Sequence, residues 1–115
     1  MRLIFKICDQ DIWNAAEAAG VYHGSEDDKR DGFIHFSTAT QLPATLGKHY
    51  AGCDNRLLIA FDADALGDKL KWEPARDGDL FPHLYAPLPA SAGLWTKPLP
   101  LGENAEHILP AEARP

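Results

Sequence analysis

The sequence has few cysteines and no long apolar run. Only two of its 115 residues are cysteine, and Cys8 and Cys53 lack the Cys-x-x-Cys spacing of a redox or metal motif. We interpret both as small, partly buried apolar residues in a reducing compartment. The opening segment has no apolar stretch long enough for a secretion signal or a membrane span, so we expect a cytoplasmic protein that makes no membrane contact.

Basic residues are also scarce, and they form no long run. The 17 Asp and Glu residues outnumber the 11 Lys and Arg residues, which gives a formal net charge of -6. Because nucleic-acid binding depends on clustered cations, we do not expect the protein to bind DNA, although the sequence permits a local basic pocket. The five histidines are widely spaced and lack the paired spacing of metal ligands, so we predict no metal site.

Several catalytic signatures are missing as well. The chain has no Gly-x-Gly-x-x-Gly, no Lys-containing phosphate loop, no His-Glu-x-x-His and no Gly-x-Ser-x-Gly. Their absence narrows the enzyme classes to which the chain could belong. Hydrophobic residues, by contrast, are plentiful and make up 45% of the sequence. That content lets one domain bury a core without disulfides or a structural metal.

The hydrophobic pattern predicts strands in both halves of the chain. Residues 3–8 alternate as a strand with one buried face and one mixed face. Residues 57–61 form a continuous apolar run, which predicts a central strand buried on both faces. Shorter extended segments are expected at residues 33–37, 70–73, 81–85 and 94–101.

Two helices are predicted, both in the first half. The first begins at an aspartate cap, Asp9 or Asp11, and ends at Gly20. The second begins near Thr38, which has a glutamine three residues later as in a capping box, and ends near Gly52. This order of elements predicts an α+β fold in which two helices pack on a mixed, mainly antiparallel sheet.

The composition changes after Gly102, where Ala, Glu and Pro become frequent. We therefore expect a single domain over residues 1–102 and a loosely ordered C-terminal tail over residues 103–115. The acidic stretch at residues 26–31 lies between the two predicted helices, and we interpret it as a loop that keeps the surface soluble.

The segment from Gly32 to Thr38 is the first candidate site. Strand alternation puts His35 and Ser37 on one face, and a helix is expected to begin beside them at Thr38. Free amides and the dipole at a helix start suit a phosphate or carboxylate, so an anion site is one interpretation. The other is that Ser37 and Thr38 only cap the helix and that His35 is a half-buried structural residue.

The segment from Phe81 to Tyr85 is the second candidate. Its alternation puts His83 and Tyr85 on one face of the strand. There they could orient a polar ligand or stack on a flat ring. The alternative is that both are ordinary hydrogen-bonded core residues. Glu73 lies next to Trp72, and a carboxylate beside a large apolar ring can have a raised pKa suited to acid–base catalysis. A solvated glutamate on an edge strand is the alternative.

These motifs resemble a bacterial and plant family catalogued as domain of unknown function 952 (DUF952). The resemblance covers the chain from about Leu3 to Leu88 and names no reaction. It is carried by Ile4 to Ile7, Trp13, Gly32 to Thr38, Gln41, Trp72-Glu73 and Phe81 to Tyr85.

That family is in turn distantly similar to the NAD-using ADP-ribosyltransferase fold, above all to RNA 2′-phosphotransferases. Their His-x-His-x-Ser strand resembles residues 33–37, where Phe33 stands in place of the first histidine. The strand end that carries His-Gly-Thr in those enzymes corresponds to Lys6-Ile7-Cys8. The resemblance implies NAD as a cofactor, His35 and Glu73 as catalytic residues, and Ser37 among the ligand-binding residues.

The leading hypothesis is a polar cleft that binds a nucleotide-like or phosphorylated small molecule, as in an NAD-dependent transferase. The expected ligand-binding residues are Lys6, Ser37, Thr38, His83 and Tyr85, with His35 and Glu73 in catalytic roles. The alternative is a non-enzymatic binding or interaction module. Both share one spatial test, because the cleft exists only if the imidazoles of residues 35 and 83 face a common hollow.

Overall fold

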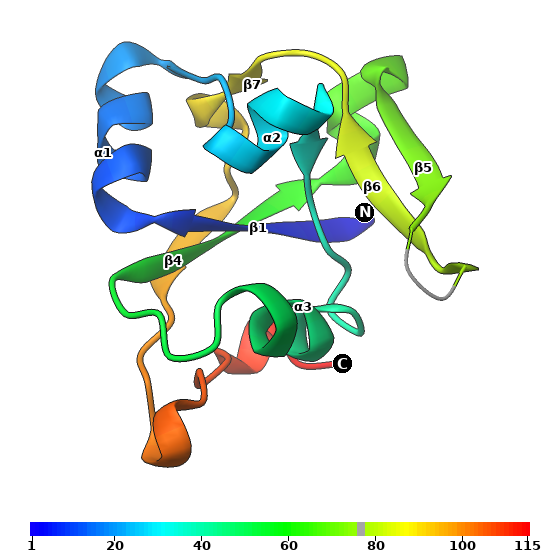
Figure 1. Cartoon of the computed structure of the whole chain (residues 1–115). Helices are drawn as coiled ribbons and strands as arrows, with labels where there is room; N and C mark the ends of the chain where they lie inside the picture. Colours follow the sequence, from blue (N-terminus) through cyan, green and yellow to red (C-terminus); the bar gives the residue numbers. More distant parts are fainter. Residues whose placement is uncertain (76–77) are drawn as a thin grey trace.

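Antiparallel sheets and short helices build the α+β fold, as Figure 1 shows. The structure is a computed structural model that describes residues 1–75 and 78–115. Within these residues the strands form three sheets, with the orders β1-β4-β8, β2-β7 and β3-β6-β5. No helix in this part of the chain combines the length and the apolar character that crossing a membrane requires.

The first sheet holds the core. In it β4 (Arg56–Asp62) lies between β1 (Leu3–Asp9) and β8 (Trp95–Pro98), and five consecutive residues of β4 are buried. This confirms the predicted central strand. The mixed face predicted for the first strand is wrong, because β1 is buried on both faces and even Lys6 is only 4% exposed.

The other two sheets are smaller, and one of them brings the candidate motifs together. In it β6 (Leu80–Leu84) pairs on one side with β3 (Ile34–His35) and on the other with β5 (Leu70–Pro74). The register of β3 and β6 sets His35 directly opposite His83. A two-stranded ladder joins β2 (Val21–Tyr22) to β7 (Leu88–Pro89).

The first half of the chain contains three α-helices rather than the two predicted: α1 (Gln10–Ala19), α2 (Glu26–Asp31) and α3 (Leu42–His49). Helix α2 occupies the acidic stretch that we interpreted as a loop. A reciprocal capping box starts it, because Ser25 Oγ accepts from the amide of Asp28 and the Asp28 carboxylate accepts from the amide of Ser25. It ends at Gly32, whose φ of 88° suits glycine.

The expected capping box at Thr38 also forms, but the helix starts later than predicted. The Thr38 amide donates to Gln41 Oε1, and the Gln41 amide donates to Thr38 Oγ1. These bonds close a turn ahead of α3, which begins at Leu42 with a proline in its first turn. Four 3-10 helices complete the described elements: η1 (Ala63–Lys69), η3 (Ala90–Ala92), η4 (Glu103–Ala105) and η5 (Ala111–Ala113).

Two hydrophobic clusters lie on opposite faces of the β1-β4-β8 sheet. One contains Trp13 of α1 against Ile4 and Phe61. The other contains Leu42 and Leu46 of α3 and, from the C-terminal segment, Leu99 and Ala113. The sheet is therefore covered on both sides, which accounts for the burial of consecutive residues in β1 and β4.

The C-terminal tail packs against the domain, although we expected it to be loosely ordered. Ala113 is fully buried, His107 Nε2 lies 2.7 Å from the carbonyl oxygen of Cys53, and Lys97 forms an ion pair with Glu112. Figure 1 shows this segment beside α3. The composition of the tail did not predict this packing, because the packing depends on a single small side chain. That side chain is Ala113, which is buried in the second hydrophobic cluster.

We expect the substitution Ala113→Asp to lower the free energy of unfolding by about 1–3 kcal/mol, because it buries a carboxylate without a partner. Ala111→Asp is the matched control, since Ala111 is exposed two residues away and should change stability by less than about 0.5 kcal/mol. Urea unfolding of both variants measures the difference. Equal stabilities would contradict the docking of the tail.

Candidate functional site

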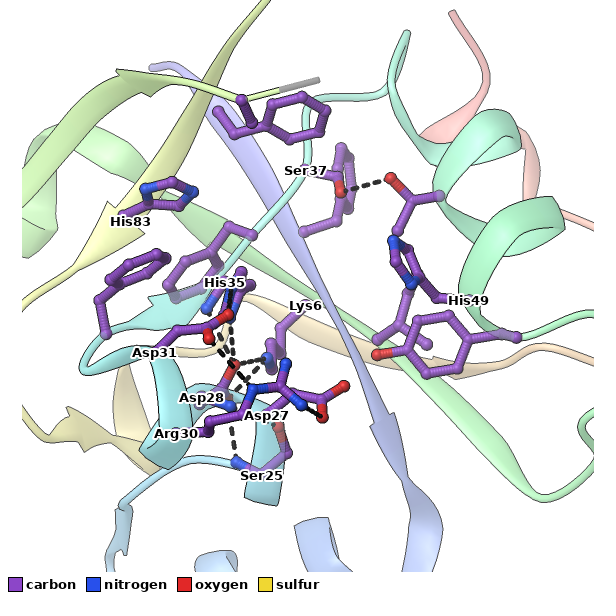
Figure 2. A pocket seen from close by; sticks show the side chains of 18 of the residues that line it. Lys6, Ser25, Asp27, Asp28, Arg30, Asp31, His35, Ser37, His49 and His83 are labelled. Carbon is purple, nitrogen blue, oxygen red and sulfur yellow. Dashed lines mark hydrogen bonds and ion pairs between the residues drawn. The ribbon is translucent and has the colours of Figure 1, made fainter.

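A pocket of about 380 Å³ lies between α2, α3 and the β3-β6-β5 sheet, as Figure 2 shows. Residues of β1 form its inner wall. Four of the residues that we expected to form a cleft line it: Lys6, His35, Ser37 and His83. Volumes of 300–1,000 Å³ are usual for small-molecule sites, so the pocket is large enough for a ligand of modest size.

The two imidazoles face this common pocket. The ring centroids of His35 and His83 are 5.5 Å apart, as expected for cross-strand partners on one face of a sheet. The ring of Phe33 lies against both, 4.0 Å from His83 in a stacked arrangement and 4.6 Å from His35. The His35 side chain is 37% exposed and that of His83 is 8% exposed. Both imidazoles therefore line one pocket, as the cleft hypothesis requires.

Asp28, which we assigned to the soluble surface, is the buried centre of a hydrogen-bond network. Its carboxylate is 2% exposed and accepts from Lys6 Nζ at 2.9 and 3.1 Å, from His35 Nδ1 at 2.7 Å and from the Tyr22 hydroxyl at 3.4 Å. Burial alone would raise the pKa of Asp28, but the hydrogen bond from His35 and the charge of Lys6 lower it well below its usual range. Asp28 is therefore ionised at neutral pH and neutralises the buried Lys6.

His35 lies between two carboxylates. Its Nδ1 contacts Asp28, and its Nε2 lies 3.0 Å from Oδ2 of Asp31. Carboxylate oxygens therefore occupy both ring nitrogens of His35. Arg30 in turn contacts Asp31 at 3.2 Å and Asp27 at 3.1 Å. A phosphate placed at His35 would have to compete with these carboxylates.

Glu73 and Tyr85 lie behind His83 and outside the lining of the pocket. Glu73 Oε1 accepts from His83 Nδ1 at 2.8 Å and from the Tyr85 hydroxyl at 2.6 Å. The hydrogen bond from Tyr85 and then that from His83 lower the pKa of Glu73, so of the two interpretations of this residue the raised pKa is wrong. The physical reason is strand alternation, which turns Trp72 to the other face of β5, where Arg2 covers its ring.

The hydroxyls of the first candidate segment have separate roles. Ser37 Oγ lies in the pocket 3.2 Å from Thr45 Oγ1 of α3. Thr38 serves the turn before α3 and does not line the pocket. The pocket is lined by the side of α3, through Thr45 and His49, rather than by the start of α3. The anion site that we expected at the helix start is therefore not where the pocket lies.

Sequence reasoning missed most of the polar lining. It did not single out Asp28, Arg30 and Asp31 of α2 or Thr45 and His49 of α3 as site residues. The available signal for α2 was Ser25 three residues before Asp28, a capping-box spacing inside a stretch that looked like a loop. Among residues 1–75 and 78–115, no group of three or more His, Cys, Asp or Glu side chains is placed to hold a metal ion.

Comparison with known proteins identifies the family and a solved relative. Residues 7–96 match the family model described as "Protein of unknown function (DUF952)". The crystal structure of protein CC0527 from Caulobacter crescentus is 40% identical, with a TM-score of 0.92 over 96% of this chain and 97% of that one. Its solution NMR structure is 42% identical, with a TM-score of 0.84 over 92% and 91% of the two chains. No curated protein matches this chain.

Proposed function

This chain belongs to the DUF952 family, whose description assigns no reaction, and we propose from the pocket itself that the protein binds a nucleotide-like small molecule. The observation that carries the proposal is the shared pocket of about 380 Å³ in which His35 and His83 lie 5.5 Å apart beside aromatic rings and hydroxyls. Ligand sites combine such apolar walls with a few convergent polar groups.

Aromatic side chains supply a wall for a flat ring. Phe33, Phe81 and Tyr50 all line the pocket and are partly buried. Burial, together with the nearby charge of Asp28, raises the pKa of Tyr50 to about 12, so its hydroxyl stays neutral at physiological pH. A nucleobase offers both the flat apolar face that such a wall accommodates and edge groups for hydrogen bonds.

Hydroxyl and imidazole groups suit the sugar. Ser37 Oγ, Thr45 Oγ1 and the ring of His83 line the interior, and each can exchange hydrogen bonds with a ribose hydroxyl. The Ser37 side of the pocket is fixed by the antiparallel bridge between Ser37 and Phe5 of β1. This end of the pocket is therefore rigid, as a recognition site requires.

The phosphate belongs at the mouth of the pocket. Arg30 and His49 are exposed and line it from α2 and α3. Arg30 uses its Nε and Nη1 for Asp31 and Asp27, and a guanidinium has five N–H donors, so donors remain for a phosphate. Lys6, one of the expected ligand-binding residues, is instead held by Asp28.

The size of the pocket favours a mononucleotide, or one half of a larger molecule such as NAD. The resemblance to NAD-using ADP-ribosyltransferases makes NAD-dependent transfer the more specific form of the proposal. In that form the adenosine or nicotinamide half enters the pocket and the rest lies across the mouth beside Arg30. The competing form is a binding module that takes the same ligand without reacting.

Calorimetric titration with AMP, adenosine, ADP-ribose and NAD tests the proposal. We expect AMP to bind with a dissociation constant below 1 mM, and adenosine to bind more weakly because it lacks the phosphate. No heat from any of the four at millimolar concentration rejects a nucleotide ligand. Binding of NAD without binding of AMP would overturn the mononucleotide fit and favour the cofactor.

Paired variants of α2 locate the phosphate. Arg30→Gln should weaken AMP severalfold and leave adenosine unchanged, because only AMP carries the charge that Arg30 meets. Lys29→Gln is the matched control, since Lys29 has the same charge on the same helix but does not line this pocket. Equal losses in the two variants would show a general charge effect and contradict the phosphate position.

A further inference from the structure

The two nitrogens of the His83 ring have different surroundings. Nδ1 lies 2.8 Å from Oε1 of Glu73. Nε2 has no hydrogen-bond partner within residues 1–75 and 78–115, and the ring lines the pocket. Figure 2 shows this ring on β6, at the wall of the pocket. An ionised carboxylate only accepts, so a neutral His83 carries its proton on Nδ1 and offers a lone pair from Nε2.

Three neighbours fix this arrangement. The Phe33 ring stacks on His83 with centroids 4.0 Å apart and planes inclined by 27°, which sets the plane of the imidazole. Glu73 is held from its other side by the Tyr85 hydroxyl at 2.6 Å, so its Oε1 has a fixed position behind Nδ1. In a histidine that accepts protons at one ring nitrogen, the other nitrogen is commonly oriented by a carboxylate.

The charges that face His83 come from three elements: β5, with Glu73 and the cross-strand partner Lys71, α2 with Asp31, and β3 with His35. Glu73 of β5 and Asp31 of α2 favour the charged ring, whereas burial and His35 of β3 disfavour it. Burial is the largest effect, and the pKa of His83 is lowered from its ordinary value of 6.5. The ring is therefore mostly neutral at pH 7, the state in which its Nε2 can accept.

We propose that His83 is the proton acceptor of the pocket, and that its Nε2 takes a hydrogen bond or the proton from a hydroxyl of the bound ligand, with Glu73 as the positioning residue. This proposal rests on the proposed function in one respect, because the ribose of a bound nucleotide supplies the hydroxyl. In the transfer, the O–H bond electrons stay on the ligand oxygen and the proton moves to Nε2. The resulting imidazolium keeps its Nδ1–H bond to Glu73.

The first test needs no ligand. Long-range ¹H–¹⁵N correlation spectra of the labelled protein report which nitrogen of His83 carries the proton. We expect the Nδ1–H form at pH 7 and a midpoint below 6.5 in a pH titration. An Nε2–H form, or an imidazolium at pH 7, would overturn the proposal.

Variants of Glu73 separate positioning from a merely structural role. Glu73→Ala should release Nδ1 and shift the proton towards Nε2. Glu73→Gln should restore the Nδ1–H form, because the amide oxygen still accepts, while the lost charge lowers the titration midpoint further. Tyr85→Phe is the control, since it removes a donor to Glu73 but keeps the Glu73–His83 contact. An unchanged tautomer in Glu73→Ala would overturn the positioning role.

The second test adds the ligand. Wild-type protein should bind AMP at least about fivefold more tightly than 2′,3′-dideoxy-AMP, and His83→Phe should lose this preference while it retains binding of the dideoxy compound. A preference that persists in His83→Phe would assign the hydroxyl to another residue and overturn the proposal. If AMP does not bind but His83 carries its proton on Nδ1, the nucleotide ligand is rejected. The assignment of His83 as the proton acceptor of the pocket is then retained.

Discussion

The substitution Asp28→Asn is expected to lower the free energy of unfolding by about 3–5 kcal/mol, because it leaves a buried cation without its counter-ion. Lys6 is 4% exposed, and its only ion pair within residues 1–75 and 78–115 is with Asp28. The amide would also lose the charge that Asp28 presents to His35. Urea unfolding followed by tryptophan fluorescence measures the change.

Two further variants identify the cause. Asp27→Asn removes a carboxylate from the same helix, but Asp27 is 69% exposed, so the change should stay within about 0.5 kcal/mol. The double variant Lys6→Met with Asp28→Asn removes both buried charges and should recover about half of the loss or more. If Asp28→Asn is as stable as Asp27→Asn, the buried pair is not what holds α2 to β1.

The same carboxylate makes stability depend on pH. The folded-state pKa of Asp28 lies below its ordinary value of 3.8, so the unfolded chain binds a proton there more readily. The contribution of Asp28 is therefore fully present above that value and is lost as the pH falls below it. Wild-type protein should lose stability on acidification from pH 5 to pH 2.5 more steeply than Asp28→Asn, and parallel curves would contradict the assignment.

Filling the pocket from α3 is expected to weaken AMP binding at least about tenfold, or about 1.4 kcal/mol. Thr45→Phe places a ring in the space that Thr45 now lines, at the expense of one hydrogen bond to Ser37, about 1 kcal/mol of stability. Ala44→Phe is the matched control, since Ala44 is exposed and does not line the pocket. Equal affinities in the two variants would place the ligand elsewhere.

His35→Ala is a less clean test of binding. The His35 ring contacts Asp28 through Nδ1, so its removal disturbs the buried network as well as the pocket wall. A loss of ligand in that variant would mix stability with recognition. Thr45 and His83 separate the two because neither contacts Asp28.

The strands were the most predictable part of the fold. The apolar run at residues 57–61 gave the central strand because a buried strand has no polar face to break the pattern. Period-two alternation also predicted that His35 and Ser37 share a face, and likewise His83 and Tyr85. It could not show that β3 pairs with β6, because strand pairing between residues 48 positions apart leaves no local signal.

Helix α2 was missed because its residues have no apolar periodicity. Its six residues are all charged, and its stability comes from the Ser25 capping box and from contacts with Lys6 and His35, which are distant in sequence or lie beyond its end. The interpretation of Asp28 as a surface residue failed for the same reason. A buried lysine in β1 requires a buried partner, and only the tertiary structure shows which one.

The central claim is that a nucleotide-like ligand enters the pocket between α2, α3 and β6. Titration of ¹⁵N-labelled protein with AMP tests it most directly, since amide shifts report where the ligand lies. We predict that the largest shifts fall on Ser37, Thr45 and His83, and that they disappear in Thr45→Phe but persist in Ala44→Phe. Shifts confined to the α1 side of the sheet, or their absence at 5 mM AMP, would contradict the claim.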